Sequence, residues 1–462
     1  MNSVVLDASF AAELQRRRQR LYEKLGDRVA VVGSAPAAVH HNDVEFPYRQ
    51  DSDFFYLTGL NEPEAVALFA PQHPEHRFVL FVRPRDPEAE RWVGKRLGVE
   101  GAKEIYGADA AYPIAELPEK LPLYLEKASQ LCYSFGGNES LNATVLQVYR
   151  RQVALYARRG TGVQGLLDLR FLLAPLRQHK SPWEVAKLRQ AIHIAAIAHA
   201  NARQMARPGV GEWEIEAQLA ADFRRLGGQG PAYPSIVAGG ANACILHYTD
   251  NNCRLQDGDL LLIDAGCSYD YYNSDITRTF PVNGRFTAEQ RAIYDIVLRA
   301  QQAAIAEVKP GAAYNQPHEA AVRVIVEGLR DLGLLVGDTA DLMAGEPAPA
   351  TETFKEQEER EKRKPYKPFF LHRTGHFLGL DVHDVGNYRE GEGWTALAPG
   401  MVITIEPGIY IAPDLPVAAG QPEVPERWHG IGIRIEDDVL VTDTGCEVLT
   451  AAVPKLPAEL TA

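Results

Sequence analysis

The sequence predicts an α/β N-terminal domain followed by an α+β domain with pseudo-twofold symmetry. Three observations lead to this fold class. Strand-like and helical patterns alternate through the first third of the chain, a new pattern starts near residue 175, and two later segments share one outline. These segments are GDLLLIDAG (258–266) and GMVITIEPG (400–408). Such a near-repeat indicates that the second domain is built from two related halves.

The N-terminal part alternates between two periodicities. Short apolar runs at 28–34, 64–71 and 77–84 predict strands. Helical spacing of apolar residues occurs at 10–25 and 116–129. Interleaving of this kind favours a sheet covered by helices, and no motif in this part carries recognisable chemistry.

The second domain begins with a helix start. Ser181 and Glu184 have the spacing of a capping box, Pro182 stands at the first helical position, and apolar residues then recur at helical spacing. We therefore expect a domain boundary at about residue 175, which gives domains at 1–174 and 175–462.

Two further segments of the second domain carry local signals. Thr287 and Gln290 form a second capping-box pattern, which predicts another helix. The segment TETFKEQEEREKRK (351–364) is charged throughout and follows the Pro/Ala-rich linker GEPAPA. A solvated helix or a mobile loop is the expected structure for such a charge run.

The bulk composition excludes several classes of protein. The chain has 462 residues, enough for two or three domains, and its formal net charge of -13 argues against nucleic acid or an anionic membrane as main partner. Its five cysteines include no CxxC pair, which favours a reducing compartment. The N-terminus lacks a signal-peptide pattern, and no stretch reaches the roughly 18 apolar residues of a membrane span. We expect a cytoplasmic protein.

Four carboxylates stand at the ends of predicted strands. Asp264 and Glu406 end the strands of the near-repeat. Asp275 follows Asp264 at a distance suited to a hairpin, and Glu436 lies in a further strand, GIRIEDDVLV. An ionised carboxylate near the interior must be paired, hydrogen-bonded or bound to a metal, because an unpaired buried charge is costly.

Three histidines, His372, His376 and His383, lie between these carboxylates in HRTGHFLGLDVH. Four carboxylates and one imidazole predict a cage for two divalent cations, with Mn, Co, Fe or Zn favoured over a soft metal. Single residues allow other interpretations. An Asp at a strand end is usually a turn or cap residue, and His372 and His376, four apart, could share a helix face as core histidines.

The ordered set and its flanking motifs identify a family. With DITRTF, GLDVHDVG, TIEPGIYIAPD and GIGIRIEDD around the five residues, the chain resembles the pita-bread metallopeptidases, and within them the aminopeptidase P (Xaa-Pro aminopeptidase) group. YRQDSDFFYLTGLNEPEAV (48–66) and ERWVGKRLG (90–98) are similar to the N-terminal domain of that group, so the resemblance covers most of the chain. Methionine aminopeptidases lack such a domain, and creatinase lacks the metal cage.

The resemblance implies a set of site residues. The implied metal ligands are Asp264, Asp275, His376, Glu406 and Glu436, of which Asp275 and Glu436 bridge. The implied catalytic residues are Glu406, His383, His372, His247 and Arg434. The implied substrate-binding residues are His247, His372, His383, Tyr410, Arg434 and Trp92. Two divalent metal ions are expected, with Mn²⁺ first and Co²⁺, Zn²⁺ or Fe²⁺ as alternatives.

The resemblance also implies an activity. Such an enzyme releases the N-terminal residue from peptides with proline at the second position, through attack by a hydroxide that bridges the metal ions. Glu406 would carry the proton and His383 would donate to the oxyanion. The N-terminal domain is expected to support a homodimer or homotetramer, with Trp92 directed toward a neighbouring subunit's cleft.

Two departures from the family pattern and two rival functions stay open. Arg373 stands where the family usually has a small residue, and the 351–364 segment resembles an insertion before the histidine motif. The nearest rival is prolidase, which cuts only Xaa-Pro dipeptides. A remote rival is an inactive pita-bread fold used as a binding module, which the presence of all five ligand positions argues against.

Overall fold

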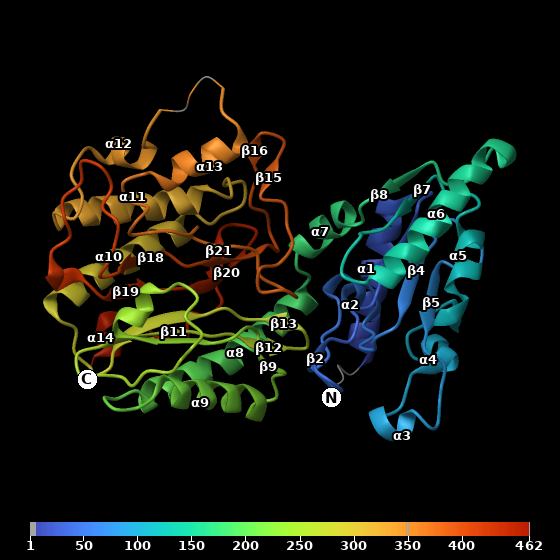
Figure 1. The fold of residues 1–462 in the computed structure, drawn as a ribbon, viewed down its shortest axis with the longest axis horizontal. Coiled ribbons are helices and arrows are strands. Elements are labelled where there is room, and N and C mark those ends of the chain that lie inside the picture. Colours follow the sequence, from blue (N-terminus) through green and yellow to red (C-terminus); the bar gives the residue numbers. More distant parts are fainter. Residues whose placement is uncertain (1–5, 348, 350, 462) are drawn as a thin grey trace. The chain divides into compact units, whose positions relative to one another are not determined.

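The computed structural model describes residues 6–347, 349 and 351–461 (Figure 1). The chain divides into two compact units, residues 1–177 and 178–462. The expected boundary near residue 175 lies inside helix α7 (Arg170–Gln178). Within the described ranges, no helix combines the length and apolar character that a membrane span requires.

The N-terminal unit is built on a six-stranded mixed sheet in the order β6-β5-β4-β1-β7-β8. The strands are β1 (Val29–Gly33), β4 (Val66–Phe69), β5 (Phe78–Val82), β6 (Ala110–Pro113), β7 (Gln130–Cys132) and β8 (Gly165–Leu167). β4 runs antiparallel to β1 and β5, whereas β7 is parallel to β1 and β8. The three strands predicted for this part are confirmed as β1, β4 and β5.

Helices cover this sheet, as the alternating pattern predicts. The predicted helical segments are confirmed as α1 (Ala8–Leu25) and α5 (Leu117–Tyr124). Apolar residues of α5 and of α6 (Glu139–Arg159) form one core with strand residues. The remaining elements are the hairpin β2 (Val39–His41) and β3 (Val44–Glu45), α2 (Ser52–Thr58), α3 (Glu90–Val93), α4 (Gly98–Glu104) and η1 (Ile114–Glu116).

The first half of the second unit is a helix pair followed by short strands. The capping box at Ser181 is confirmed, because its hydroxyl accepts from the Glu184 amide and the Glu184 carboxylate accepts from the Ser181 amide. The elements are α8 (Pro182–Met205), α9 (Glu212–Arg225), β9 (Gly230–Pro231), β10 (Ile236–Gly239), η2 (Gly240–Cys244), β11 (Leu260–Asp264), β12 (Cys267–Tyr269), β13 (Tyr272–Asn273) and β14 (Thr277–Pro281). Strands β10, β11 and β14 form one antiparallel sheet.

The second half repeats this plan. The capping box at Thr287 is confirmed at the start of α10. The elements are α10 (Ala288–Ala306), α11 (Gln316–Asp331), α12 (Thr339–Ala344), α13 (Phe354–Lys362), β15 (Arg389–Glu390), β16 (Gly393–Trp394), β17 (Val402–Ile405), β18 (Gly408–Ile411), η3 (Glu426–Trp428), β19 (Ile431–Arg434), β20 (Asp437–Val441), β21 (Cys446–Val448) and α14 (Pro457–Leu460). Strands β17, β20 and β21 form the matching antiparallel sheet.

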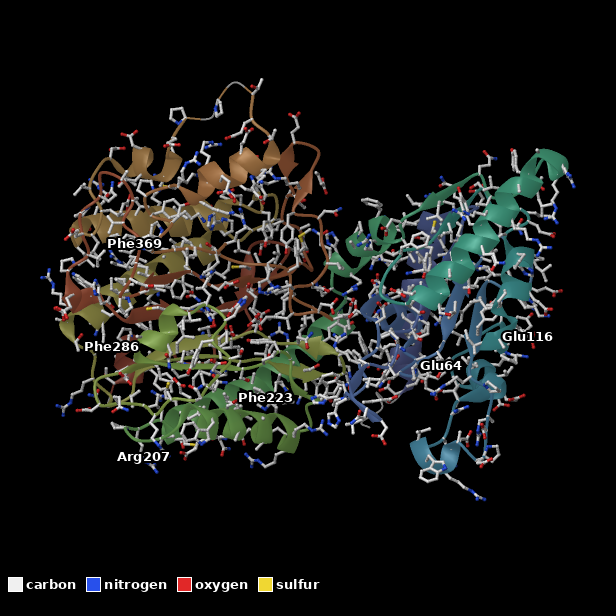
Figure 2. The ribbon with its side chains drawn as sticks, in the orientation of Figure 1. Glu64, Glu116, Arg207, Phe223, Phe286 and Phe369 are labelled. Carbon is white, nitrogen blue, oxygen red and sulfur yellow. The ribbon has the colours of Figure 1, made fainter. Side chains whose placement is uncertain are left out.

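The two halves enclose one core. Helices α8 and α9 contact each other, as do α10 and α11, and Figure 1 shows the two pairs on opposite sides of the unit with strands between them. A single hydrophobic cluster contains residues of both helix pairs and both sheets. Phe223 of α9 and Phe369 both belong to it (Figure 2). The two helix pairs therefore pack against the two sheets from opposite sides.

The charged segment 351–364 contains helix α13, with Thr353 as its capping residue. Most of its described side chains are exposed. The expectation of a solvated helix is therefore confirmed. Residues 348 and 350 of the preceding Pro/Ala-rich linker lie outside the described residues.

Candidate metal centre and active site

Two antiparallel strand pairs carry the four predicted carboxylates at matching ends. Asp264 ends β11 and pairs with Thr277 of β14, two residues after Asp275. In the other half Ile405, the last residue of β17, pairs with Asp437, the first residue of β20. Because Glu406 follows Ile405 and Glu436 precedes Asp437, these two carboxylates lie next to this pair, at the same end of the two strands. The hairpin expected from the spacing of Asp264 and Asp275 is confirmed.

Tyr233 joins the first two carboxylates. Its hydroxyl lies 2.6 Å from Asp264 Oδ1 and 2.5 Å from Asp275 Oδ1. A hydroxyl has one proton, so it donates to one carboxylate at a time and holds both close together. Sequence reasoning missed this residue because Tyr233 stands in a short loop before β10, where neither periodicity nor a flanking motif marks it.

His376 lies on an extended segment that runs beside β17. The Thr404 amide donates to the His376 carbonyl, and the His376 amide donates to the Thr404 hydroxyl. Its Nε2 is 3.4 Å from Asp275 Oδ2 and 3.7 Å from Glu406 Oε1. No helix forms over residues 371–376, so the alternative of two core histidines on one helix face is wrong.

Two glycines, one in each half, allow the backbone segments that carry the site residues to lie close to each other. A Cβ on Gly266 would lie 1.8 Å from the Ser274 carbonyl oxygen, and one on Gly375 would lie 1.9 Å from the Thr404 carbonyl oxygen. Neither position can hold a side chain without displacing backbone. The spacing of the carboxylates and His376 therefore depends on both glycines.

The electrostatics of the cluster favour bound cations. Burial raises the pKa of Glu436 well above its ordinary value, and Asp275, Glu406 and Asp264 raise it further. Burial also raises the pKa of Glu406 to about 7. Burial lowers the pKa of His376, but the hydrogen bond to Asp275 and the charge of Glu406 outweigh this and raise it to about 9. Crowded like charges out of water are unfavourable until a cation compensates them.

The donor set fits divalent metal. Ligand atoms of Asp275, His376 and Glu436 all lie within 4.8 Å of one another. Asp264 and Glu406 border the same cluster through Tyr233 and His376. Carboxylate oxygens with a single imidazole suit Mn²⁺, Fe²⁺, Co²⁺ or Zn²⁺. The five predicted ligands are thus brought together from two hairpins and one extended segment.

A hydrogen-bonded chain leads from Asp264 to His372. Arg434 Nη2 lies 2.6 Å from Asp264 Oδ2, and Nη1 donates to the Tyr410 hydroxyl at 2.9 Å. The Tyr410 hydroxyl donates to His372 Nε2 at 2.7 Å. His372 Nδ1 faces the Arg373 carbonyl at 2.7 Å, so it carries the proton and Nε2 accepts. Burial, with the nearby Arg434, lowers the pKa of His372 to about 3 and keeps the ring neutral.

His383 and His247 lie at the open side of the cluster. The His383 ring centroid is 4.2 Å from that of His376, and both His383 and His247 are exposed. Burial and the charges of His376 and His247 lower the pKa of His383. The next residue, Asp384, accepts a hydrogen bond from Lys180 Nζ at 2.9 Å, and both of these side chains are 1% exposed. This buried ion pair fixes the loop that carries His383.

Trp92 is the one predicted site residue that belongs to the other unit. It lies on α3 of the N-terminal unit and is 86% exposed. Its predicted role depends on a second copy of the chain and stays a prediction.

Comparison with known proteins decides the family. The sequence profile described as "Metallopeptidase family M24" matches residues 186–443, and that described as "Aminopeptidase P, N-terminal domain" matches residues 14–152. The chain belongs to metallopeptidase family M24. Its first unit is the aminopeptidase P N-terminal domain, and its second unit has the pita-bread fold that the family resemblance implied. The chain is thus a metallopeptidase that depends on divalent metal.

This M24 peptidase aligns with its relatives over nearly its whole length. It is 43% identical to an Xaa-Pro aminopeptidase of Escherichia coli (strain K12), over 97% of each chain. It is 41% identical to an Xaa-Pro aminopeptidase of Haemophilus influenzae, over 97% of this chain and 96% of that one. Among solved structures it matches aminopeptidase PepP of Pseudomonas aeruginosa with a TM-score of 0.88 and 47% identity, over 97% of each chain. A zinc-substituted E. coli aminopeptidase P in complex with product matches with a TM-score of 0.87 and 43% identity, over 97% of each chain.

Proposed function

We propose that this M24 peptidase is an Xaa-Pro aminopeptidase, which releases the first residue of peptides whose second residue is proline. The observation that carries the proposal is the convergence of four carboxylates, three of them buried, and His376 at the ends of two hairpins. The presence of an aminopeptidase P N-terminal domain supports the substrate class. The names of relatives that align over the full length support it as well.

The proposed metal ligands, which would hold two divalent ions, are Asp264, Asp275, His376, Glu406 and Glu436. Mn²⁺ is the proposed metal, because the donors are mainly hard carboxylate oxygens. When bound, the metal ions lower the pKa of water and polarise the scissile carbonyl. Tyr233 and Arg434 hold Asp264 in place through the hydrogen bonds described above.

A proline on the leaving side changes what the enzyme must recognise. The scissile bond is a tertiary amide, so its nitrogen has no hydrogen to donate. Recognition by an added strand is therefore weak, and side chains around the ring must orient the substrate. His372, His247 and Tyr410 are proposed to form that surface, since the hydrogen bond between His372 and Tyr410 fixes both rings.

Glu406 is proposed to move the proton. Its carboxylate lies between two imidazoles, 3.7 Å from His376 Nε2 and 3.6 Å from His372 Nδ1. From this position it accepts a proton from the attacking water and delivers it to the departing proline nitrogen. His383, exposed at the open side beside His376, is proposed to donate to the developing oxyanion.

The proposal extends to assembly and location. The domain 1–174 is proposed to hold copies together as a homodimer or homotetramer, with the exposed Trp92 reaching the site of a neighbouring copy. A solution mass equal to the 51.0 kDa chain would exclude this. All five cysteines are unpaired in the structure, and a cytoplasmic location stays a prediction from their pattern.

The decisive experiment compares an Xaa-Pro dipeptide with an Xaa-Pro-Yaa-Zaa peptide. Metal-stripped enzyme is assayed before and after Mn²⁺ is added. Metal-dependent release of Xaa from the longer peptide is the expected result. Cleavage of the dipeptide alone would identify a prolidase, and binding without cleavage of either peptide would indicate an inactive binding module.

A further inference from the structure

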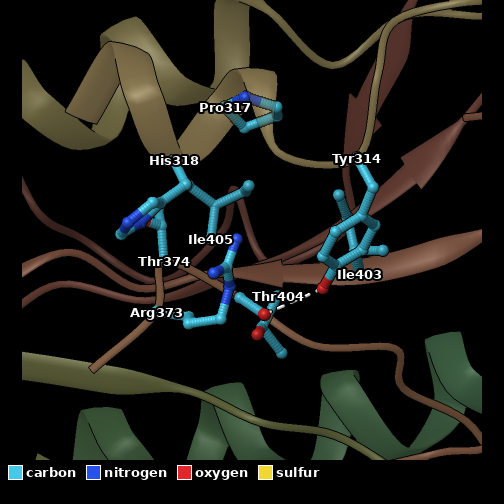
Figure 3. Close-up of a pocket in the computed structure, with 9 residues that line it drawn as sticks. Tyr314, Pro317, His318, Arg373, Thr374, Ile403, Thr404 and Ile405 are labelled. Carbon is cyan, nitrogen blue, oxygen red and sulfur yellow. Dashed lines mark hydrogen bonds between the residues drawn. The ribbon is translucent and has the colours of Figure 1, made fainter. Parts of the chain in front are cut away.

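Arg373 lines a small pocket beside the active site. The pocket lies between the start of α11 and β17, and Figure 3 shows the Arg373 side chain reaching into it between His318 and Tyr314. Its guanidinium donates to the Asn315 side-chain oxygen, a neutral acceptor. The residue is exposed, so an incoming peptide can reach it. The space is about 10 Å³, which holds one water-sized group.

Other cations surround Arg373. Its guanidinium lies 4.8 Å from the Trp394 ring centroid, and that of Arg389 lies 4.0 Å from the same centroid. Lys367 Nζ lies 5.5 Å from the ring centroid of its neighbour Tyr366. Burial lowers the pKa of Lys367 to about 8, and the charge of Arg373 contributes to that shift. Arg373 is therefore close enough to be repelled by both Lys367 and Arg389.

This cation cluster (Lys367, Arg373 and Arg389) lacks carboxylate partners. In the part of the chain that the structure describes, none of the three side chains forms an ion pair. The nearby carboxylate of Glu361 pairs instead with Lys364 at 2.8 Å. The N-terminal end of α11, beside Arg373, adds further positive potential. A cluster of this kind favours an anion from outside the chain.

The pocket adjoins the reacting groups. Arg373 directly follows His372, and its carbonyl fixes the His372 ring. Thr404 lines the same pocket, and its hydroxyl lies 3.4 Å from Glu406 Oε1. An extended peptide advances about 3.3 Å per residue. Thr404 therefore joins the pocket to Glu406, a span on the scale of one or two peptide residues.

We propose that Arg373, supported by Lys367 and Arg389, binds a carboxylate of the peptide substrate on the far side of the proline. The small pocket takes the tip of a carboxylate and excludes larger anions. The peptidase accordingly favours substrates with an acidic residue after the proline, or with the free C-terminus there. This inference rests on the proposed function for its substrate class.

Matched peptides and one charge-removing variant test this specificity. Ala-Pro-Glu-Ala is compared with Ala-Pro-Gln-Ala, and Ala-Pro-Ala with its C-terminal amide, using Mn²⁺-loaded enzyme. We expect kcat/KM to favour the acidic member of at least one pair by about tenfold, the scale of a charge-assisted contact at a partly exposed arginine. The difference should lie in KM. The first pair reports a side-chain carboxylate, and the second reports the C-terminus.

The variant Arg373→Gln should reduce that preference to near unity, and Arg373→Lys should retain part of it. Arg363→Gln is the matched control, because Arg363 is a 57% exposed cation paired with Glu346 in the neighbouring segment. This control should leave the ratio unchanged. A wild-type enzyme with no preference in either pair, or a preference that survives in Arg373→Gln, would overturn the proposal.

Equilibrium binding separates this proposal from the proposed activity. Titration calorimetry of the same holoenzyme with Pro-Glu-Ala and Pro-Gln-Ala needs no turnover. The acidic peptide should bind about tenfold tighter to the wild type and no tighter to Arg373→Gln. Equal binding contradicts the carboxylate site even where cleavage is normal. Absence of cleavage with selective binding would count against the aminopeptidase and leave the carboxylate site standing.

Discussion

Glu406 is the residue on which the proposed chemistry depends most directly. Replacement by Gln keeps its shape and the Thr404 contact but removes the proton acceptor. We expect kcat to fall by at least about 10³-fold, since this change removes both a ligand charge and general-base catalysis. Steady-state assays, with circular dichroism to verify the fold, check this. Turnover within tenfold of wild type would remove Glu406 from the proton-transfer role.

Tyr233 offers a subtler test at the same scale. Tyr233→Phe removes a hydroxyl that holds Asp264 and Asp275 together and leaves the ring in place. Loss of such a supporting contact typically weakens metal binding by about 10- to 100-fold. Titration of metal-stripped protein with Mn²⁺ measures the change. Tyr410→Phe is a useful comparison, because Tyr410 bonds to Arg434 and His372 instead, and a similar loss there would show that the effect is not specific to the carboxylate pair.

The site residues differ in how far the sequence could predict them. The five ligands are identifiable because each stands in a motif and their order is distinctive. Tyr233 carries no such signal, since it becomes important only when the hairpin of β11 and β14 places two carboxylates beside it. The cation cluster around Arg373 is also invisible in sequence, because Trp394 and Lys367 are brought to it by tertiary packing.

At the scale of elements, a buried ion pair links the start of the second unit to the histidine loop. Lys180 precedes α8, and its partner Asp384 follows His383. Lys180→Met removes the cation and leaves the carboxylate buried without it, which should lower the free energy of unfolding by about 3–5 kcal/mol. Urea unfolding measures this. The double variant with Asp384→Asn should recover part of the loss, and a single variant as stable as wild type would argue that the pair contributes little.

His199 makes the contact between α8 and the loop after β11 sensitive to pH. Its Nε2 lies 2.9 Å from the Ala265 carbonyl, and burial lowers its pKa to about 4. An unfolded histidine titrates near 6.5, so between pH 6.5 and 4 the unfolded state binds more protons. The stabilisation is therefore complete above pH 6.5 and falls by about 2 kcal/mol on going to pH 5.

Urea unfolding of metal-stripped protein at pH 7.5, 6 and 5 checks this sign. His199→Gln keeps a hydrogen-bond donor and cannot titrate, so its stability should decline less steeply with acid than that of wild type. Parallel curves for the two proteins would mean that His199 is not the titrating group.

The positions of helices and strands can be predicted from local sequence signals, whereas the pairing of strands in the sheets cannot. Capping boxes mark the starts of α8 and α10, and apolar runs mark β1, β4 and β5. The order of the N-terminal sheet could not be predicted in the same way. β7 and β8 have three residues each. β7 pairs with β1 in parallel and β8 pairs with β7, and strands this short carry too little sequence pattern to predict that order.

For the whole molecule, metal should act as a stabilising ligand. Buried carboxylates that repel one another in the folded state bind cations that the unfolded chain binds poorly. Mn²⁺ at about a hundredfold excess over its dissociation constant should raise the melting temperature by roughly 5 °C. Differential scanning calorimetry with and without Mn²⁺ checks this, and Ca²⁺ at equal ionic strength controls for screening. An unchanged melting temperature would mean that the site is not loaded.

Gly266 and Gly375 have a consequence for anyone who wishes to redesign this enzyme. Each leaves no room for even a methyl group against a facing carbonyl, one in each half of the catalytic unit. Mutations in the histidine segment (residues 372–376) that aim to alter substrate preference must therefore leave Gly375 unchanged. Libraries that randomise Arg373 and Thr374 can explore new specificities, whereas libraries that extend through residue 375 will consist mostly of proteins in which the histidine segment can no longer lie against β17.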